Sequence, residues 1–325
     1  MFSIRKLSRQ FVAVTTIAWT VVAHSAYPEK AVKIVVGFAP GGTTDLTARF
    51  IAQALTEQMG KPFVVENRTG ASGTIAYDMV AKSAPDGYTL AMADPTTAMV
   101  PGLFKQLPFN VVRDFLPVSQ IISSPMAIMI YPGLKANTLK EFIALAKASP
   151  GSLSYGSGGV GSNAHLGGEM FKSSAGVNLL HVPYRGAGDA VQALLGGQVH
   201  MLISALPTAI ANAPSGKLRV LAVASPGKQR SSSLPDVPTT VEAGLTDFVI
   251  LNFFGIMAPT GTPRPIVAQL HQEIVKALAN PQLRERFIAQ GGDPVGSSPD
   301  DFGKLFRDEV ERWGNVIRKN DIQPE

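Results

Sequence analysis

A stretch near the start of the chain, residues 32–49, most constrains what this sequence can fold into. It begins with a β-branched run, residues 32–36, which predicts a buried strand. A Pro-Gly-Gly turn follows at residues 40–42, and the Thr-Thr-Asp of residues 43–45 supplies the polar side chains that begin helices. Apolar residues spaced for one helix face come next: Leu46, Phe50, Ile51, Leu55 and Met59. The stretch therefore predicts a strand, a tight turn and a helix in direct succession.

The turn at Gly41 and Gly42 suits an anion. Glycine has no Cβ, so the backbone can adopt unusual φ angles and leave its N–H groups unobstructed. Those N–H groups, together with the positive end of the helix dipole, favour a carboxylate or another oxyanion. An ordinary strand-to-helix turn explains the same residues equally well, so both interpretations stay open on this stretch alone.

The bulk composition indicates a folded globular protein with room for two domains. The chain has 325 residues, of which 45% are hydrophobic and 16% are charged, which excludes a disordered chain. With 0 Cys, it has no disulfide framework, no thiol nucleophile and no Cys-ligated metal. The formal net charge is +5, but no basic run is interleaved with aromatics, so we expect no nucleic-acid partner.

The first 26 residues have the outline of a secretory signal peptide. Arg5, Lys6 and Arg9 precede an apolar run over residues 11–23, and small residues follow it. The apolar run is too short to span a bilayer comfortably. We therefore expect cleavage between residues 23 and 27 and a mature protein that is free in the periplasm.

Strands and helices alternate along the rest of the chain. Residues 32–93 have a β-α-β-α-β pattern, which predicts a parallel sheet with helices on its faces. Two further apolar runs, residues 118–122 and 126–131, are separated by Ser-Ser-Pro. The alternation then restarts with predicted helices at 139–148, 164–175 and 190–195, strands at 153–155, 179–183, 200–205 and 218–224, a returning strand at 248–258, and terminal helices at 265–279, 283–290 and 299–319.

Polar residues follow two of the predicted strands. Ligands of open α/β sheets bind beyond the carboxyl ends of the strands, so Asp94 and Thr96 should share an edge with the Gly41 turn. After the predicted strand 179–183, Arg185 either holds a ligand carboxylate through two hydrogen bonds or is a solvated loop residue. Asp189 suits a helix N-cap as well as a ligand contact.

A second glycine-rich loop, residues 156–161, satisfies the G-x-G-x-x-G pattern between a strand and a helix. A dinucleotide site is disfavoured, because no Asp or Glu follows the next strand to hold a ribose and the loop lies in mid-chain of an exported protein. The loop still offers bare N–H groups, the hydroxyls of Ser157 and Ser162, and a helix N-terminus to an anion.

Catalytic and metal-binding patterns are poorly supported. The histidines after the leader are His165, His181, His200 and His271, and no two have the i, i+4 spacing of metal ligands. No G-x-S-x-G elbow marks a hydrolase serine. We therefore expect no enzyme activity, no cofactor and no metal.

Several motifs follow one another along the chain: Phe38-Ala39-Pro40-Gly41-Gly42-Thr43-Thr44-Asp45, Val65-Glu66-Asn67-Arg68 with Gly70-Ala71, Ala84-Pro85-Asp86-Gly87-Tyr88-Thr89-Leu90, Tyr155-Gly156-Ser157, Gly161-Ser162, His165-Leu166, His181-Val182-Pro183-Tyr184-Arg185-Gly186, Leu195-Gly196-Gly197-Gln198-Val199 and Leu234-Pro235-Asp236-Val237-Pro238-Thr239. Together these motifs resemble the Bug family, the periplasmic solute receptors of tripartite tricarboxylate transporters. The resemblance covers nearly all of the chain after the leader.

The resemblance implies an α/β, two-domain periplasmic-binding-protein fold of the Venus-flytrap, type II-like kind with two crossover segments. Domain 1 would comprise residues 27–125 plus 249–325, and domain 2 residues 126–248. A small organic carboxylate would bind between them, with the hinge at the two crossings. The expected ligand-binding residues are Phe38, Ala39, Gly41, Gly42, Thr43, Asp94, Thr96, Ser157, Gly161, Ser162, His165, Arg185, Asp189 and Ser204.

The chain departs from the family pattern after the third predicted strand. Many relatives have an asparagine and a tyrosine where this chain has Val100 and Phe104. A ligand carboxylate beside Asp94 would be repelled unless an ammonium, amide or hydroxyl group lay between them. This argues against a plain dicarboxylate and leaves amino acids, amides and aromatic acids open.

The resemblance thus implies a non-enzymatic receptor, which we expect to be a monomer. It would capture its carboxylate and deliver it to a membrane transporter of the tripartite tricarboxylate type. A sensory receptor that passes its ligand state to a signalling protein would have the same sequence features. An exported α/β enzyme acting on an acyl or phosphoryl substrate is the third hypothesis.

Overall fold

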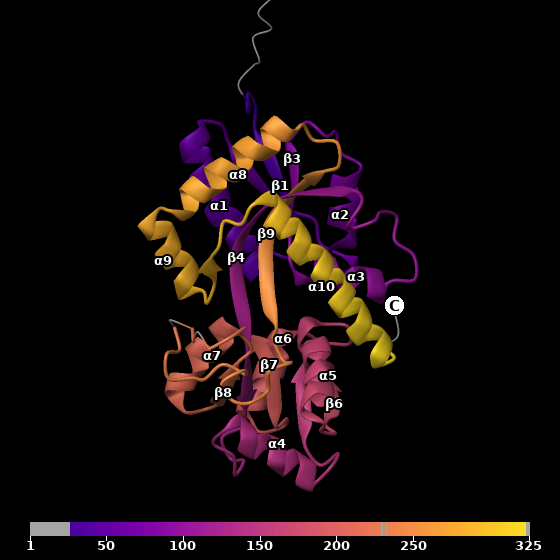
Figure 1. The fold of residues 1–325 in the computed structure, drawn as a ribbon, viewed down its shortest axis with the longest axis vertical. Helices are drawn as coiled ribbons and strands as arrows, with labels where there is room; N and C mark the ends of the chain where they lie inside the picture. The colour runs from indigo at the N-terminus through magenta and orange to yellow at the C-terminus, as the bar shows by residue number, and fades with distance from the viewer. Residues whose placement is uncertain (1–26, 229, 232, 323–325) are drawn as a thin grey trace, which may run out of the picture.

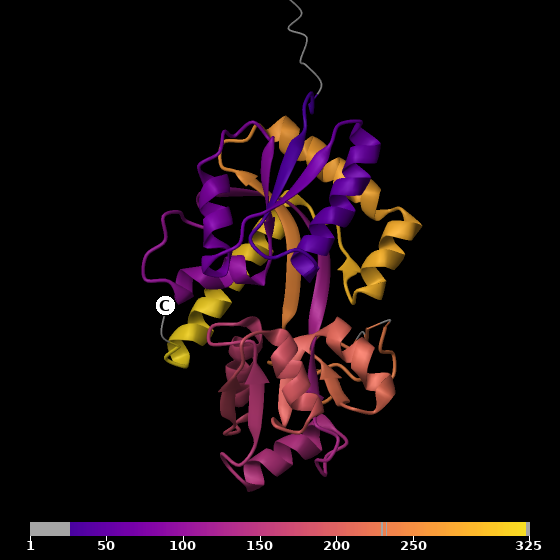
Figure 2. The same ribbon diagram turned by 180° about the vertical axis from the view of Figure 1, so that it is seen from behind.

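The structure, a computed structural model, describes residues 27–322 except residues 229 and 232. The predicted signal peptide, residues 1–26, lies outside the described residues. Two lobes are joined by two long strands, β4 (Phe115–Ile130) and β9 (Leu251–Pro259) (Figures 1 and 2). Each lobe is a sheet covered by helices, which makes the fold α/β.

The first lobe is built on three parallel strands, β1 (Val32–Val36), β2 (Phe63–Asn67) and β3 (Thr89–Ala93). β1 lies between the other two, and β3 pairs with the antiparallel β9. Lys33 is the one exposed residue of β1, because helices pack on both faces of this sheet. The helical segments that connect these strands are α1 (Thr43–Met59), η1 (Ala71–Gly73), α2 (Thr74–Ala81) and α3 (Pro95–Leu103).

The end of the chain returns to the first lobe. It forms α8 (Arg264–Leu278), α9 (Pro281–Ala289), the two-residue strand β10 (Asp293–Pro294) and α10 (Pro299–Lys319). α10 packs along α3 (Figure 1). Its Trp313 is 1% exposed and donates its indole N–H to Glu309 at 2.9 Å.

β4 is one continuous strand, so the predicted break at residues 123–125 is wrong. As far as Pro125 the strand pairs with β9, and from Met126 onward it pairs with β7 (Met201–Ala205) and β8 (Arg219–Val223). Pro125 lies where β4 exchanges its partners. A strand tolerates proline where no ladder hydrogen bond requires its N–H.

The second lobe continues the sheet from β4 through β7 to β5 (Ser154–Ser157) and β6 (Leu180–Pro183). β5 is parallel to both of its neighbours. The helical segments of this lobe are α4 (Leu139–Ala148), α5 (Asn163–Ala175), α6 (Ala187–Leu195), α7 (Leu206–Asn212) and η2 (Ala213–Ser215).

The helix predictions were confirmed over residues 139–148 and 299–319, and two helices were missed. α3 and α7 both start directly after a strand, and both have a proline in their first turn. α6 begins three residues earlier than predicted, with Gly186 as its N-cap. Asp189 therefore lies in the first turn of α6, and the interpretation of Asp189 as an N-cap is wrong.

We expect Trp313→Ala to lower the free energy of unfolding by about 3–5 kcal/mol, because the indole is fully buried where α10 covers the first lobe. Denaturant unfolding of the purified protein measures this change. Val112→Ala, which removes an apolar side chain that is 42% exposed, should stay within about 0.5 kcal/mol of the parent. Equal losses for the two variants would contradict the prediction.

Candidate functional site

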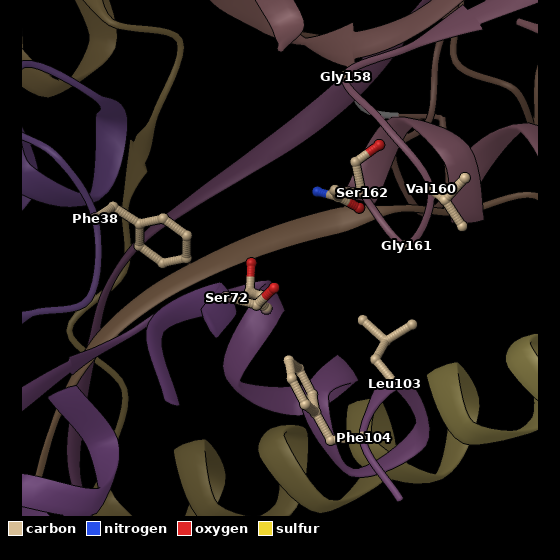
Figure 3. A pocket seen from close by; sticks show the side chains of 10 residues that line it. Phe38, Ser72, Leu103, Phe104, Gly158, Val160, Gly161 and Ser162 are labelled. Atoms are coloured by element: carbon tan, nitrogen blue, oxygen red, sulfur yellow. The ribbon is translucent and has the colours of Figure 1, made fainter. Parts of the chain in front are cut away.

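A cavity of about 290 Å³ lies between the two lobes (Figure 3). The first lobe contributes the loop after β1, the turn η1 and helix α3, and the second lobe contributes the loop between β5 and α5. The lining residues are Phe38, Ser72, Thr96, Leu103, Phe104, Gly158, Val160, Gly161, Ser162 and Asn163. None of these ten side chains carries a charge.

The loop after β1 is held by the buried carboxylate of Asp45. Gly41 adopts a φ of +93°, and its N–H donates to Asp45 Oδ2 at 2.9 Å. Arg49 and Asn67 also donate to this carboxylate. Burial alone would raise the pKa of Asp45, but these hydrogen bonds, with the Arg49 guanidinium foremost, lower it overall. The Gly41 N–H, which we expected to bind the ligand, therefore already donates to Asp45 of α1.

The same loop brings only one of its five expected residues to the cavity. The Phe38 ring points into it (Figure 3). Ala39, Gly41 and Gly42 are exposed and Thr43 is half-buried, but none of these four lines the cavity.

The second-lobe loop is held by His165. Ser162 caps α5 by accepting the His165 N–H at 3.3 Å, and the Gly161 N–H donates to His165 Nδ1 at 3.0 Å. A ring nitrogen that accepts a hydrogen bond carries no proton, so His165 is neutral and holds its proton on Nε2. Gly161 has a φ of +75°, which an L side chain would strain.

A second histidine, His181, contacts both His165 and Ser157 and so supports the same loop. Its ring stacks on His165 with the centroids 4.0 Å apart, and its Nε2 lies 2.7 Å from Ser157 Oγ. Burial, and secondarily the neighbouring His165, lowers the pKa of His181 to about 4, and burial lowers the pKa of His165 as well. Both rings are therefore neutral near pH 7. Ser157 and His165 are buried behind the loop and do not line the cavity.

Asp94 is a capping group at the start of α3. Its carboxylate accepts the N–H groups of Thr96 and Thr97 and the Thr44 hydroxyl at 2.9 Å, and Tyr77 OH lies 3.4 Å away. The residue is 3% exposed and does not line the cavity. The argument that Asp94 would repel a dicarboxylate therefore loses its basis.

Three expected residues lie away from the cavity. Arg185 and Asp189 are exposed on the loop after β6 and at the start of α6. Arg185 makes no ion pair with the residues that the structure describes. Ser204 is half-buried, with its hydroxyl 3.3 Å from that of Thr208.

Ser72 is a lining residue that the sequence analysis missed. Ala71 and Ser72 have φ angles of +44° and +53°, a region that residues with a Cβ rarely adopt, between two glycines that also have positive φ. Strained backbone of this kind is concentrated at functional sites. The Ser72 hydroxyl faces the cavity and makes no hydrogen bond within the described residues (Figure 3). The spacing of apolar residues, from which the strands and helices were predicted, does not predict such a turn.

The described residues contain no group of three or more His, Asp or Glu that could hold a metal ion. Within the same residues, no helix has the length and apolar character required to cross a membrane.

Comparison with known proteins identifies close relatives. Residues 47–322 match the family described as the tripartite tricarboxylate transporter family receptor. Protein BugT of Bordetella pertussis is 39% identical over 311 residues, which cover 95% of this chain and 94% of BugT.

Two solved structures from R. palustris share the fold. One, determined with adipate, has a TM-score of 0.79 and 34% identity and covers 92% of this chain and 100% of its own. The other, MatC with bound malate, has a TM-score of 0.75 and 32% identity and covers 90% of this chain and 100% of its own. The expected periplasmic-binding-protein fold is confirmed.

We expect the buried Asp94 carboxyl to make stability depend on pH between about 4 and 6. Burial raises the pKa of Asp94 from 3.8 to about 6, so the folded state binds this proton more tightly than the unfolded state does. The contribution of the carboxyl is complete below pH 4 and is lost as pH rises through 6, a loss of about 2–3 kcal/mol. Asp94→Asn keeps an N-cap acceptor and removes the titration. The free energy of unfolding of the parent should therefore fall relative to the variant over this interval, and parallel curves would contradict the assignment.

Proposed function

The chain belongs to the tripartite tricarboxylate transporter receptor family, and we propose that it is a periplasmic solute-binding protein that captures a small organic carboxylate. It closes its two lobes on this ligand and delivers it to a membrane transporter of the tripartite tricarboxylate type. The relatives solved with adipate and malate support a carboxylate as the class of ligand.

One observation carries this proposal: neutral hydrogen-bond donors from both lobes surround a single cavity. Thr96 in the first turn of α3 and Ser162 at the N-cap of α5 bring hydroxyls to the cavity from opposite lobes. The Thr96 N–H is held by Asp94, so the helix N-terminus that remains available to a ligand is that of α5. Backbone N–H groups and helix dipoles at such termini favour an anion without a buried lysine or arginine. We assign the direct ligand contacts to the Phe38 ring, the hydroxyls of Thr96 and Ser162, and the backbone of Gly161, whose own N–H donates to His165.

Other expected residues act through these contacts. Asp94 positions the start of α3, and Ser157 and His165 position the second-lobe loop. Gly41, locked to Asp45, shapes the loop that carries Phe38. Ala39, Gly42 and Thr43 approach the ligand only when the lobes close.

The lobes are proposed to move as domains made of residues 27–125 plus 249–325 and residues 126–248. The crossings at Pro125–Met126 of β4 and near Asn252 of β9 serve as hinges. Asn163, at the start of α5, donates its side-chain N–H to Asn252 Oδ1 at 2.6 Å and so ties the ligand-binding loop to one crossing.

The surroundings of the Ser157–His181 pair near the site disfavour an enzymatic role. Ser157 and His181 lie at the distance of a nucleophile and its base, but Ser157 is fully buried and its hydroxyl also contacts Gly159. An imidazole with a pKa of about 4 is a weak base near neutral pH. We infer that the protein binds its ligand without turnover.

Ser162→Ala should weaken carboxylate binding by about 10- to 100-fold, because it removes a hydrogen bond to a charged group. The lost cap also costs about 1 kcal/mol of stability, so affinity is measured directly by calorimetric titration. Ser298→Ala is the matched control, since Ser298 caps α10 through the same kind of hydrogen bond, to Asp301 N–H. It should lose similar stability and keep its affinity; equal affinities for both variants would refute the Ser162 contact.

Ligand should lower the radius of gyration measured by small-angle X-ray scattering, because closing the cleft makes the molecule more compact. The same ligand, radiolabelled, should enter cells that carry the gene and fail to enter cells that lack it. Unchanged scattering would contradict lobe closure. If the deletion strain takes up the ligand normally but its transcriptional response to the ligand is altered, the protein is a sensory receptor and not a transport receptor.

A further inference from the structure

We propose that the ligand is a monocarboxylate with an apolar body, an alkyl chain or an aromatic ring, and that Phe104 is the residue that selects it. This inference rests on the proposed function and names the ligand class of the same site. It differs from the adipate and malate of the two solved relatives, which each carry two carboxylates.

The first argument is the distribution of charge. The cavity lining offers hydroxyls and backbone N–H groups, and no lysine, arginine or histidine side chain is part of it. The arginines close in sequence to the first-lobe loops are already paired, Arg49 with Asp45 and Arg68 with Glu66. Arg185, which the sequence analysis considered for a ligand carboxylate, does not line the cavity. One carboxylate can be held by the α5 N-terminus and the nearby hydroxyls, whereas the N–H groups at the start of α3 already donate to Asp94. The lining therefore offers a second carboxylate neither a free helix N-terminus nor a cation, and burying it there would be unfavourable.

The second argument is the apolar wall on the side of α3. Leu103 and Phe104 end this helix, and their side chains rise into the cavity beneath Ser72 and Gly161 (Figure 3). A Cβ built on Gly161 would lie 3.3 Å from Leu103 Cδ2, so Leu103 of the first lobe lies beside Gly161 of the second at this wall. The Phe38 ring faces the same space from the loop after β1.

Val160 completes this wall from the second lobe. It lies at the tip of the β5–α5 loop with 55% of its surface exposed, next to Gly161. An apolar ligand body placed between Val160 and Phe104 would remove surface of both side chains from water, which is favourable in proportion to the area buried. A charged or hydroxylated body would leave its own polar groups unpaired there.

At position 104, one added oxygen atom, the hydroxyl that distinguishes tyrosine from phenylalanine, would make the apolar wall polar. A tyrosine hydroxyl at this position would add a hydrogen-bond donor to the apolar side of the cavity, and the chain lacks it. Phe104→Tyr is therefore a minimal test, because it keeps the ring and its packing. Phe50→Tyr makes the same chemical change on α1, outside the cavity, and serves as its control.

The experiment is calorimetric titration with two matched pairs of acids: hexanoate against adipate, and benzoate against terephthalate. In each pair the diacid carries one further carboxylate, in place of the terminal methyl group of hexanoate or the para hydrogen of benzoate. We expect the monoacid of a pair to bind at least about 10-fold more tightly than its diacid. Phe104→Tyr should move the ratio toward the diacid by several-fold, and Phe50→Tyr should leave it unchanged.

The opposite order overturns the proposal and leaves the proposed function intact. If the advantage of a diacid disappears in Arg185→Gln, Arg185 holds the second carboxylate in the closed form. If none of the four acids binds, the ligand class is also wrong, and binding of malate or an amino acid then decides whether the protein is a carboxylate receptor at all. A ratio unaffected by Phe104→Tyr removes Phe104 as the selecting residue.

Discussion

The antiparallel pairing of β4 with β9 is the constraint on which the rest of the molecule depends. The two strands stay paired from Phe115 opposite Pro259 to Pro125 opposite Leu251, and β4 then continues into the sheet of the second lobe. Both lobes are therefore built on one shared strand. This connection brings the loops after β1, β3 and β5, which come from distant parts of the sequence, around one cavity.

The two lobes fix their cavity loops with different buried chemistry. In the first lobe, the carboxylates of Asp45 and Asp94 accept hydrogen bonds from the loop after β1 and from the start of α3. In the second lobe, the neutral imidazoles of His165 and His181 hold the β5–α5 loop. Buried polar groups are stable only when they are hydrogen-bonded, so these partners also restrict the conformations of the loops. A ligand meets preorganised neutral groups in both lobes.

Much of the fold was predictable because its signals are local. Periodicity gave the bounds of α4 and α10, and the β-branched run over β1 identified a strand covered on both faces. The continuity of β4 was not predictable, because the Ser-Ser-Pro break is compensated by an exchange of partner strands that no local pattern encodes. The start of α3 was missed, although Asp94 followed by Pro95 and Thr97 has the form of a capping box.

The site was predictable as far as the glycine loops and less so beyond them. Gly161 and Ser162 line the cavity, as expected. The Gly41 N–H instead donates to the side chain of Asp45, four residues later. The spacing of the residues in the sequence does not predict this hydrogen bond. Val160 lies within the predicted glycine loop, and Ser72 lies in a short glycine-flanked turn, but neither residue type marks a ligand contact. Both belong to the lining through their place in the tertiary structure. Asp94 directly follows β3, as predicted, but it is buried and does not line the cavity, because its carboxylate caps α3.

The position of β9 in the sheet also bears on how the chain acquires its structure. β9 lies between β3 and β4, yet it follows every strand of the second lobe in the sequence. During synthesis, all strands of the second lobe have been made by residue 223, whereas the strand that pairs with both β3 and β4 has not. The second lobe can thus assemble first. A nascent chain interrupted before residue 251 would expose two unpaired strand edges, which are templates for aggregation.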